Sequence, residues 1–292
     1  MRPFFSEEQD DCLGFSDQDF QQLSAFVQAQ CGIQVPIAKR TLLIEVIQER
    51  LRQVGKRTFK EYMEWLLGTE RPDEELMQFI DAVTIRETDF FHAADHFEFM
   101  VKTAIPELIK ELGAGLSREF MIWNVGCSTG EEAYTLAMVL QEFSSHYPGI
   151  PFKAKVLATD VSSRALTTAA SAVYGMAKVS PISLEMKQKY LLKSREPARR
   201  LVRIVPEVRA MVKFRRLNIM DADFGLREQM DVIFCRNVIA HFDRPTKEKL
   251  VNKFCHYLSP GGYLFMGHSE DLGGLKIPVV PSSVASIYRM PY

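Results

Sequence analysis

A short apolar run that ends in a glycine-containing turn constrains the fold of this chain more than any other feature. Residues 120–125 form the run, and the turn Val125-Gly126-Cys127-Ser128-Thr129-Gly130-Glu131-Glu132 leads into a helical pattern over 131–143. Gly126 and Gly130 permit a tight turn with positive φ, and the free N–H groups at the start of the helix point back toward it. Such a turn is typical of a nucleotide-binding site.

The two glutamates of this turn decide which kind of ligand fits it. The G-x-G-x-x-G pattern of dinucleotide enzymes is missing, and Glu131 and Glu132 stand in the first helical turn. Carboxylates disfavour a pyrophosphate there, whereas S-adenosylmethionine carries an ammonium and a sulfonium. The turn therefore indicates a cationic cofactor. The alternative is a structural turn whose acids stabilise the helix dipole.

Further apolar runs follow at residues 155–159, 230–235 and 263–266, and they alternate with helical stretches. This alternation predicts βαβ units and a parallel sheet, hence an α/β fold. A helix-like piece at 184–192 and β-like pieces at 200–205 and 211–214 interrupt it. We expect a small inserted β-subdomain at about 172–216, and an antiparallel terminal hairpin strand within 279–288.

The first third of the chain contains four helical patterns. They cover residues 16–32, 39–53, 58–67 and 72–83, with Ser16 and Thr58 as N-caps and Gly32 and Gly55 as end signals. We therefore expect three parts: an all-helical N-terminal domain over 12–84, an interdomain linker over 85–97, and an α/β domain over 98–292.

Two polar sites lie at the predicted strand ends. Asp160 ends the second strand, where a carboxylate can bind both ribose hydroxyls; it could instead cap the next helix. Arg236 and Asn237 follow the third strand at the carboxyl edge of the sheet, where ligands of open α/β folds bind. The alternative for this pair is ordinary surface polarity.

Composition excludes several classes of protein. The formal net charge of −1 gives no sign of nucleic-acid binding. The five cysteines are odd in number and form no CxxC pair, so we expect neither a disulfide framework nor a zinc knuckle, and no metal site. We find no signal peptide and no apolar stretch that could span a membrane, so we expect a cytoplasmic protein that does not insert into membranes.

Taken together, these motifs resemble the chemotaxis receptor methyltransferases of the CheR type. The resemblance covers about residues 16–290 and rests on five pieces: Ser128-Thr129-Gly130-Glu131-Glu132-Ala133-Tyr134, Ala158-Thr159-Asp160-Val161, Phe234-Cys235-Arg236-Asn237-Val238-Ile239, Leu258-Ser259-Pro260-Gly261-Gly262 and Gly267-His268-Ser269-Glu270. It implies a Rossmann-like, S-adenosylmethionine-dependent methyltransferase domain over 98–292, with a linker over 85–97 that contributes to the cofactor site. It also implies methyl transfer from S-adenosylmethionine onto glutamate side chains in the cytoplasmic helical domain of transmembrane chemoreceptors.

The resemblance also implies a set of site residues. The cofactor contacts would be Arg86, Thr88, His92, Glu132, Asp160, Asn218, Ile219, Arg236 and Asn237. Between the two glutamates of the turn, Glu132 is favoured over Glu131. Three positions depart from the family: Arg86 stands for an Asn, His92 for an Arg, and His241 for a frequent Tyr.

The two histidines among these departures, His92 and His241, would face the substrate. Each can donate a hydrogen bond, or a charge when protonated, so they are candidate catalytic residues and could make activity depend on pH. The alternative is that both are ordinary polar residues at a cleft edge.

Two features bear on the receptor. Residues 36–60 hold seven basic and two acidic residues, which predicts a basic, receptor-facing helical surface; a solvated helix face is the alternative. The loop at 192–200 lacks the glycines with which some family members grip a receptor pentapeptide. We therefore expect that no pentapeptide tether is used.

Two rival functions remain open from the sequence. One is a catalytically weak S-adenosylmethionine-binding regulator or scaffold, suggested by the departures at Arg86, His92 and His241. The other is a nicotinamide-linked dehydrogenase, which the α/β pattern allows but the missing G-x-G-x-x-G disfavours.

Overall fold

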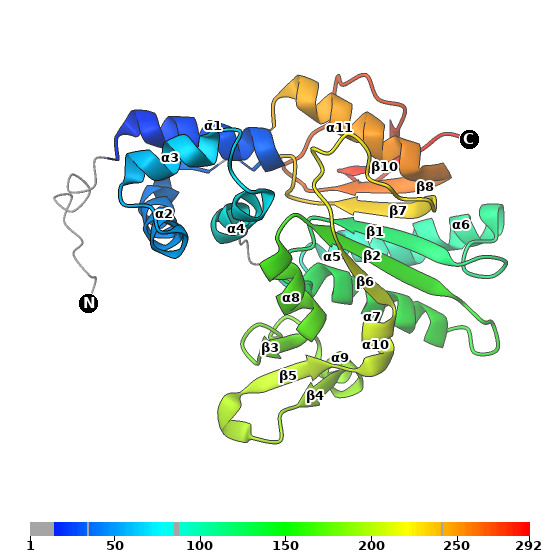
Figure 1. The fold of residues 1–292 in the computed structure, drawn as a ribbon. Coiled ribbons are helices and arrows are strands. Elements are labelled where there is room, and N and C mark those ends of the chain that lie inside the picture. The colour runs from blue at the N-terminus through cyan, green and yellow to red at the C-terminus, as the bar shows by residue number, and fades with distance from the viewer. Residues whose placement is uncertain (1–14, 34, 85–87, 241) are drawn as a thin grey trace. The chain divides into compact units, whose positions relative to one another are not determined.

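The structure is a computed structural model that describes residues 15–33, 35–84, 88–240 and 242–292 (Figure 1). The chain divides into two compact units, residues 1–85 and 86–292.

The first unit is helical throughout its described part. It contains α1 (Asp17–Cys31), the short 3₁₀-helix η3 (Ile37–Lys39), α2 (Arg40–Val54), α3 (Phe59–Leu67) and α4 (Asp73–Thr84). The predicted caps are confirmed: Ser16 accepts from the Asp19 N–H, Thr58 accepts from the Glu61 N–H, and Gly32 and Gly55 end their helices in the left-handed region. The second helix begins one residue later than predicted because residues 37–39 form the 3₁₀ turn.

A buried polar network ties three of these helices together. Arg50 of α2 forms an ion pair with Glu75 of α4, and the Tyr62 hydroxyl of α3 donates to the same carboxylate at 2.7 Å. All three side chains are buried. Arg50 was counted in the predicted basic surface, and that placement is wrong, because its guanidinium turns inward to pair with Glu75.

The second unit is built on a seven-stranded sheet of order β6-β2-β1-β7-β8-β10-β9. The first five strands are parallel, while β10 runs antiparallel to β8 and to β9. The strands are β1 (Phe120–Val125), β2 (Ala154–Asp160), β6 (Val212–Arg216), β7 (Met230–Cys235), β8 (Leu258–Met266), β9 (Val280–Pro281) and β10 (Ile287–Arg289).

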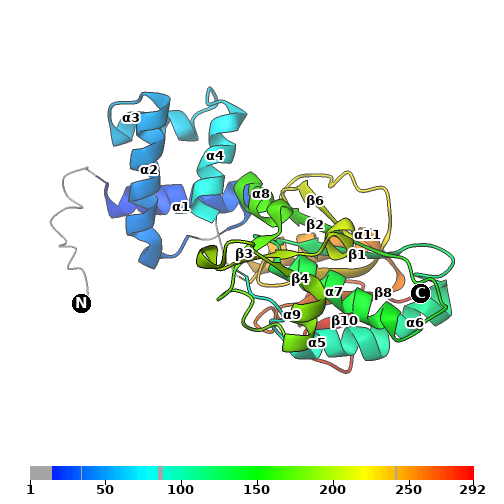
Figure 2. The same ribbon diagram turned by 90° about the horizontal axis from the view of Figure 1, so that it is seen from below.

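Both faces of this sheet are buried, which explains why its strands read as continuous apolar runs. In β1, Phe120 and Ile122 belong to one core, whereas Trp123 and Val125 belong to the other. The first core is covered by α5 (Ala94–Phe99), the π-helical segment η4 (Met100–Ala104), α6 (Ile105–Leu112) and α7 (Glu131–Ser145); the second is covered by α11 (Arg244–Tyr257). Figures 1 and 2 show these helices on opposite sides of the sheet.

A second, three-stranded sheet is inserted between β2 and β6. Its order is β3-β5-β4, all antiparallel, with β3 (Val173–Gly175), β4 (Leu191–Lys193) and β5 (Leu201–Ile204). Around it lie α8 (Ser163–Ser171), α9 (Leu184–Tyr190), the 3₁₀-helix η5 (Pro197–Arg199) and α10 (Pro206–Ala210). The insertion lies on the same side of the main sheet as α7 (Figure 2), and Lys189 and Tyr190 both donate to Glu142 of α7.

Three sequence expectations need correction here. The β-like piece at 211–214 was assigned to the insertion, but it becomes β6, the edge strand of the main sheet, because it pairs in parallel with β2. The predicted helix 184–192 ends at Tyr190, and its last two residues form β4 instead. The fourth strand begins at Leu258, five residues early, because a register shift lets the Pro-Gly-Gly segment stay within the strand.

The predicted antiparallel terminal hairpin is confirmed. It is formed by β9 and β10, with Tyr288 opposite Pro281, and β10 continues the sheet beyond β8. Within the described residues, no helix is long and apolar enough to cross a membrane.

The buried Arg50–Glu75 pair generates a stability prediction. In Glu75→Ala the Arg50 charge stays buried without its partner, which costs about 3–5 kcal/mol. We expect faster amide exchange in α2 and α4, measured by hydrogen–deuterium exchange mass spectrometry, with unchanged exchange in β1. The control Glu74→Ala removes an exposed neighbour on the same helix turn and should leave exchange unchanged. Equal protection in Glu75→Ala and wild type would contradict this account.

Candidate functional site

The candidate site lies at the carboxyl ends of the parallel strands. The chain passes from β1 to β2 on one side, whereas β7 pairs on the other side of β1, so the strand order reverses between β1 and β7. Open α/β sheets bind ligands at such a reversal. The turn after β1, Asp160 at the end of β2 and Arg236 after β7 all lie at this edge.

The glycine turn has the backbone geometry that its sequence predicts. Gly126 and Gly130 have φ of 69° and 94°, and Ser128 between them has φ of 46°. A Cβ at Gly126 would lie 2.6 Å from Cγ2 of Val238. Only glycine therefore lets this turn approach the segment that follows β7.

Asp160 closes the turn from the neighbouring strand. Its carboxylate accepts the backbone N–H of Ser128 at 2.8 Å and that of Ser162 at 2.9 Å. The alternative role, an N-cap of the next helix, is filled by Ser162, whose hydroxyl accepts the Ala165 N–H. Asp160 thus stands beside the turn at the strand end.

Glu131 is buried at the start of α7. The sequence favoured its neighbour, Glu132, as the cofactor contact. It accepts hydrogen bonds from the hydroxyls of Thr88, at 2.6 Å, and Thr129, at 2.7 and 2.8 Å. The same helix turn holds Thr135, whose hydroxyl accepts the Phe91 N–H. Glu131 and Thr135 therefore dock the segment around Thr88 onto α7.

Glu132 and Arg236 form an ion pair in the interior of the site. Arg236 Nη1 lies 2.9 Å from Glu132 Oε2, and Asn124 Nδ2 donates to Glu132 Oε1 at 2.7 Å. Burial raises the pKa of the Glu132 carboxyl, and the Arg236 charge and the Asn124 hydrogen bond oppose that rise. The guanidinium thus helps to keep a buried carboxylate ionised.

Arg236 also binds His92. Its Nη2 donates to His92 Nδ1 at 2.9 Å and to the His92 carbonyl at 2.8 Å. A guanidinium nitrogen can only donate, so Nδ1 must accept and the ring proton must be on Nε2. The exposed ring of His92 therefore carries a hydrogen-bond donor at its outer nitrogen.

Asn237 is held in position by a residue that sequence reasoning did not select. Asn237 has φ of 59°, and its N–H donates to Glu270 Oε2 at 2.9 Å. Glu270 also accepts from the N–H groups of Ile239 and Gly267, at 2.8 and 2.7 Å. A single buried carboxylate thus joins the segments after β7 and after β8.

The remaining predicted residues divide into two groups. Asn218 and Ile219 follow β6; the Asn218 side chain accepts the Met220 N–H at 3.0 Å, and Ile219 is buried. Arg86 and His241 lie outside the described residues, so their predicted roles stay predictions.

Two site residues were missed, and each had a weak signal. Asn124 is the polar residue within the otherwise apolar run of β1, and Glu270 ends the Gly267-His268-Ser269-Glu270 motif. Neither signal distinguishes a site residue from a structural one until the partners, Glu132 and the three N–H groups, are known.

The backbone is strained around the site. Of the seven non-glycine residues with positive φ in the described chain, four lie in the segments that form it: Phe91, Ala93, Ser128 and Asn237. Such conformations cost about 1–3 kcal/mol each and cluster at functional sites.

The charges of the site match a cationic ligand. Among the described residues of the turn and the two neighbouring strand ends, Glu131, Glu132 and Asp160 supply three carboxylates and Arg236 one guanidinium. Asn124 Oδ1 and Arg236 Nε are buried and have no hydrogen-bond partner among the described residues. The surplus of negative charge fits S-adenosylmethionine better than it fits a pyrophosphate.

Comparison with known proteins gives two family matches. Residues 18–84 match the family described as "CheR methyltransferase, all-alpha domain", and residues 86–284 match "CheR methyltransferase, SAM binding domain".

Curated relatives extend over nearly the whole chain. A chemotaxis protein methyltransferase of Borreliella burgdorferi is 33% identical over 264 residues, which is 90% of this chain and 92% of the relative. One of Klebsiella aerogenes is 32% identical, covering 90% and 87%. Chemotaxis protein methyltransferase 1 of Pseudomonas aeruginosa is 32% identical, covering 95% and 99%. The chain therefore belongs to the CheR methyltransferase family and is an S-adenosylmethionine-dependent methyltransferase.

Proposed function

We propose that this protein transfers a methyl group from S-adenosylmethionine to glutamate side chains in the cytoplasmic helical domain of transmembrane chemoreceptors. The products are glutamate methyl esters and S-adenosylhomocysteine, and the enzyme acts in the cytoplasm. The observation that carries the proposal is the acidic site around the Arg236–Glu132 pair, in a chain whose curated relatives are chemotaxis methyltransferases.

Methyl transfer to a glutamate carboxylate requires little acid–base catalysis from the protein. A glutamate side chain is ionised at neutral pH, so the nucleophile needs no general base. S-adenosylmethionine supplies an activated methyl group for in-line displacement. The chain's own residues therefore need only orient the two reactants and place charge.

We propose that His92 acts on the acceptor side of the reaction. Its ring is exposed, and Arg236 fixes the proton on Nε2. We propose that this N–H donates to the incoming glutamate carboxylate.

The contact with the receptor is assigned to the helical unit. Arg52, Arg57 and Lys60 are exposed, and Lys60 is 85% exposed. Several of these basic residues pair with neighbouring acids, as Lys60 does with Glu64 and Arg52 with Glu49. Exposed pairs are weak, so these cations can exchange partners with an acidic receptor surface.

The insertion supports a receptor contact without a tether. Its β4–β5 connection holds η5 and no glycine, and Arg200 adopts φ of 48° there. We propose that the protein does not bind receptor pentapeptides. Tight binding of such a peptide in a calorimetric titration would refute this proposal.

Methyl transfer to receptor-containing membranes tests the proposed function. With tritiated S-adenosylmethionine, we expect base-labile label on receptors, because glutamate methyl esters hydrolyse in base. Cofactor binding without transfer of label would instead support the rival, a catalytically weak regulator.

Asp160→Asn tests the predicted ribose contact. Hydrogen bonds to a charged group contribute about 1.5–3 kcal/mol, so affinity for S-adenosylhomocysteine should fall about 10- to 100-fold by calorimetry. Asp223→Asn is the control, because Asp223 also accepts a loop N–H, from Gly225, but in an exposed loop. Unchanged affinity in Asp160→Asn would remove this residue from the cofactor site.

Glu132→Gln and Glu131→Gln distinguish the two glutamates. Because the pKa of Glu132 is raised, it loses its charge at a higher pH than an ordinary glutamate. We therefore expect affinity for S-adenosylhomocysteine to fall as the pH is lowered from neutral toward the raised pKa. Glu132→Gln should bind more weakly at pH 7 and show less of this dependence. A larger loss in Glu131→Gln would assign the contact to Glu131.

His92→Asn and His92→Gln separate the two nitrogens of the ring. Asn can place an acceptor near the Nδ1 position, whereas Gln can place a donor near Nε2. We expect kcat/KM for receptor methylation to fall about tenfold in His92→Asn and less in His92→Gln, with cofactor affinity retained in both. A parallel loss of cofactor affinity would contradict the acceptor-side role.

A further inference from the structure

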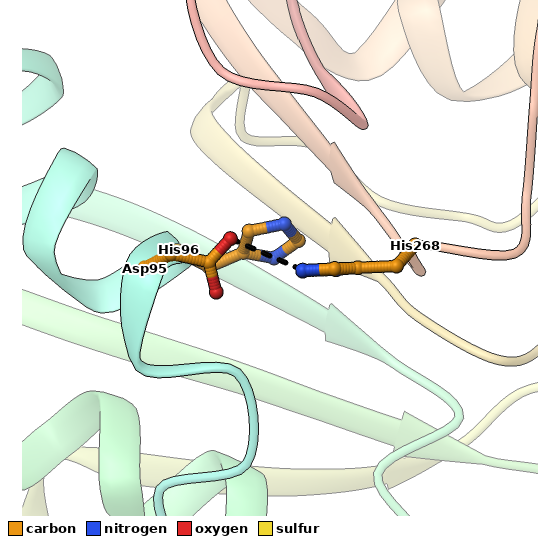
Figure 3. A group of neighbouring side chains, drawn as sticks. All are labelled: Asp95, His96 and His268. Atoms are coloured by element: carbon orange, nitrogen blue, oxygen red, sulfur yellow. Dashed lines mark ion pairs between the residues drawn. The ribbon is translucent and has the colours of Figure 1, made fainter.

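A second polar cluster lies beside the site and is used by none of the steps above. It consists of Asp95 and His96, in the first turn of α5, and His268, in the segment that follows β8. Figure 3 shows the three side chains converging from these two segments. One ligand atom from each residue lies within 4.8 Å of the others.

The hydrogen bonds of His96 determine which ring nitrogen carries the proton. The Ser286 hydroxyl donates to the Ala285 carbonyl at 2.5 Å, so its oxygen must accept from His96 Nε2, which lies 3.1 Å away. The proton of His96 is therefore on Nε2, and Nδ1 carries a free lone pair. Metal-bound histidines characteristically donate their second nitrogen to such a partner.

The Nδ1 lone pair has no use within the described protein. His96 is fully buried, and its Nδ1 has no hydrogen-bond partner among the described residues. A buried imidazole with an unshared lone pair is a good metal ligand.

The other two groups have suitable spacing and freedom. His268 Nε2 lies 3.1 Å from Asp95 Oδ2, and both side chains are about half exposed, at 51% and 50%. Two ligands of a tetrahedral zinc ion lie about 3.3 Å apart, given bond lengths of about 2.0 Å. Small side-chain movements would therefore bring all three ligand atoms around one ion, with an open position left for water.

We propose that Asp95, His96 and His268 form a binding site for one divalent transition-metal ion, with zinc as the best match to two imidazoles and a carboxylate. The sequence predicted no metal site, since its ligands come from distant segments without a recognisable spacing. The ion joins α5 to the segment that also contains Gly267 and Glu270. It therefore acts as a structural link next to the Arg236 pair and takes no part in methyl transfer.

Zinc titration of the tag-free full-length protein, dialysed against a chelator, tests the proposal. We expect calorimetry to show saturable binding of one Zn²⁺ per chain. His268→Ala and Asp95→Asn should each weaken it at least tenfold. Both residues are half exposed, so these variants should fold, unlike variants of the buried His96. His146→Ala and His256→Ala remove exposed histidines elsewhere and should bind zinc as wild type does.

Cobalt provides a second readout that a merely structural effect would not produce. Co²⁺ at the site should give visible d–d absorption that is lost in His268→Ala. The proposal is overturned if no saturable binding occurs, or if stoichiometric binding persists in both His268→Ala and Asp95→Asn. In either case the cluster is only an ion pair beside a buried histidine.

Discussion

The candidate site depends on the buried ion pair between Arg236 and Glu132. Through Arg236, it connects the segment after β7 to His92 in the segment before α5; through Glu132, it connects the start of α7 to Asn124 at the end of β1. Removing one partner of a buried pair leaves an uncompensated charge. The pair therefore forms only when these four segments, after β7, before α5, at the start of α7 and at the end of β1, are all correctly positioned.

The sheet topology explains why these segments meet. Because the strand order reverses between β1 and β7, the turns after both strands open toward the same space. Gly126 allows the close approach to Val238. Glu270 joins the loop after β7 to the segment after β8 by accepting two N–H groups from the first and one from the second. The positive-φ conformations of Ser128 and Asn237 are thus stabilised by the hydrogen bonds that their N–H groups donate to Asp160 and Glu270. These contacts keep the site preformed for its ligand.

Sequence reasoning predicted most of the architecture, because the helix caps and the apolar runs carry local signals. It was wrong where the structure of a segment depends on a partner that is distant in the sequence. Residues 212–216 have the pattern of a strand, but only their partner, β2, places them in the main sheet. From its sequence context, Arg50 is predicted to be a surface cation. In the structure its side chain is buried because it forms an ion pair with Glu75 of another helix.

For the site, the sequence predicted residues better than it predicted partners. Asp160, Arg236 and the glutamates of the turn lie together at the sheet edge. Their roles depend on contacts between distant positions, such as Thr88 with Glu131 and His92 with Arg236. Glu270 and the Asp95–His96–His268 cluster were missed for the same reason, since no spacing in one segment reveals them.

We infer that the acidic turn after β1 selects a cationic cofactor over a pyrophosphate. Calorimetric titration of the wild-type protein with S-adenosylhomocysteine and, separately, with NAD can distinguish the two. We expect saturable binding of S-adenosylhomocysteine at one site per chain and no binding of NAD. Binding of NAD without binding of S-adenosylhomocysteine would contradict this inference.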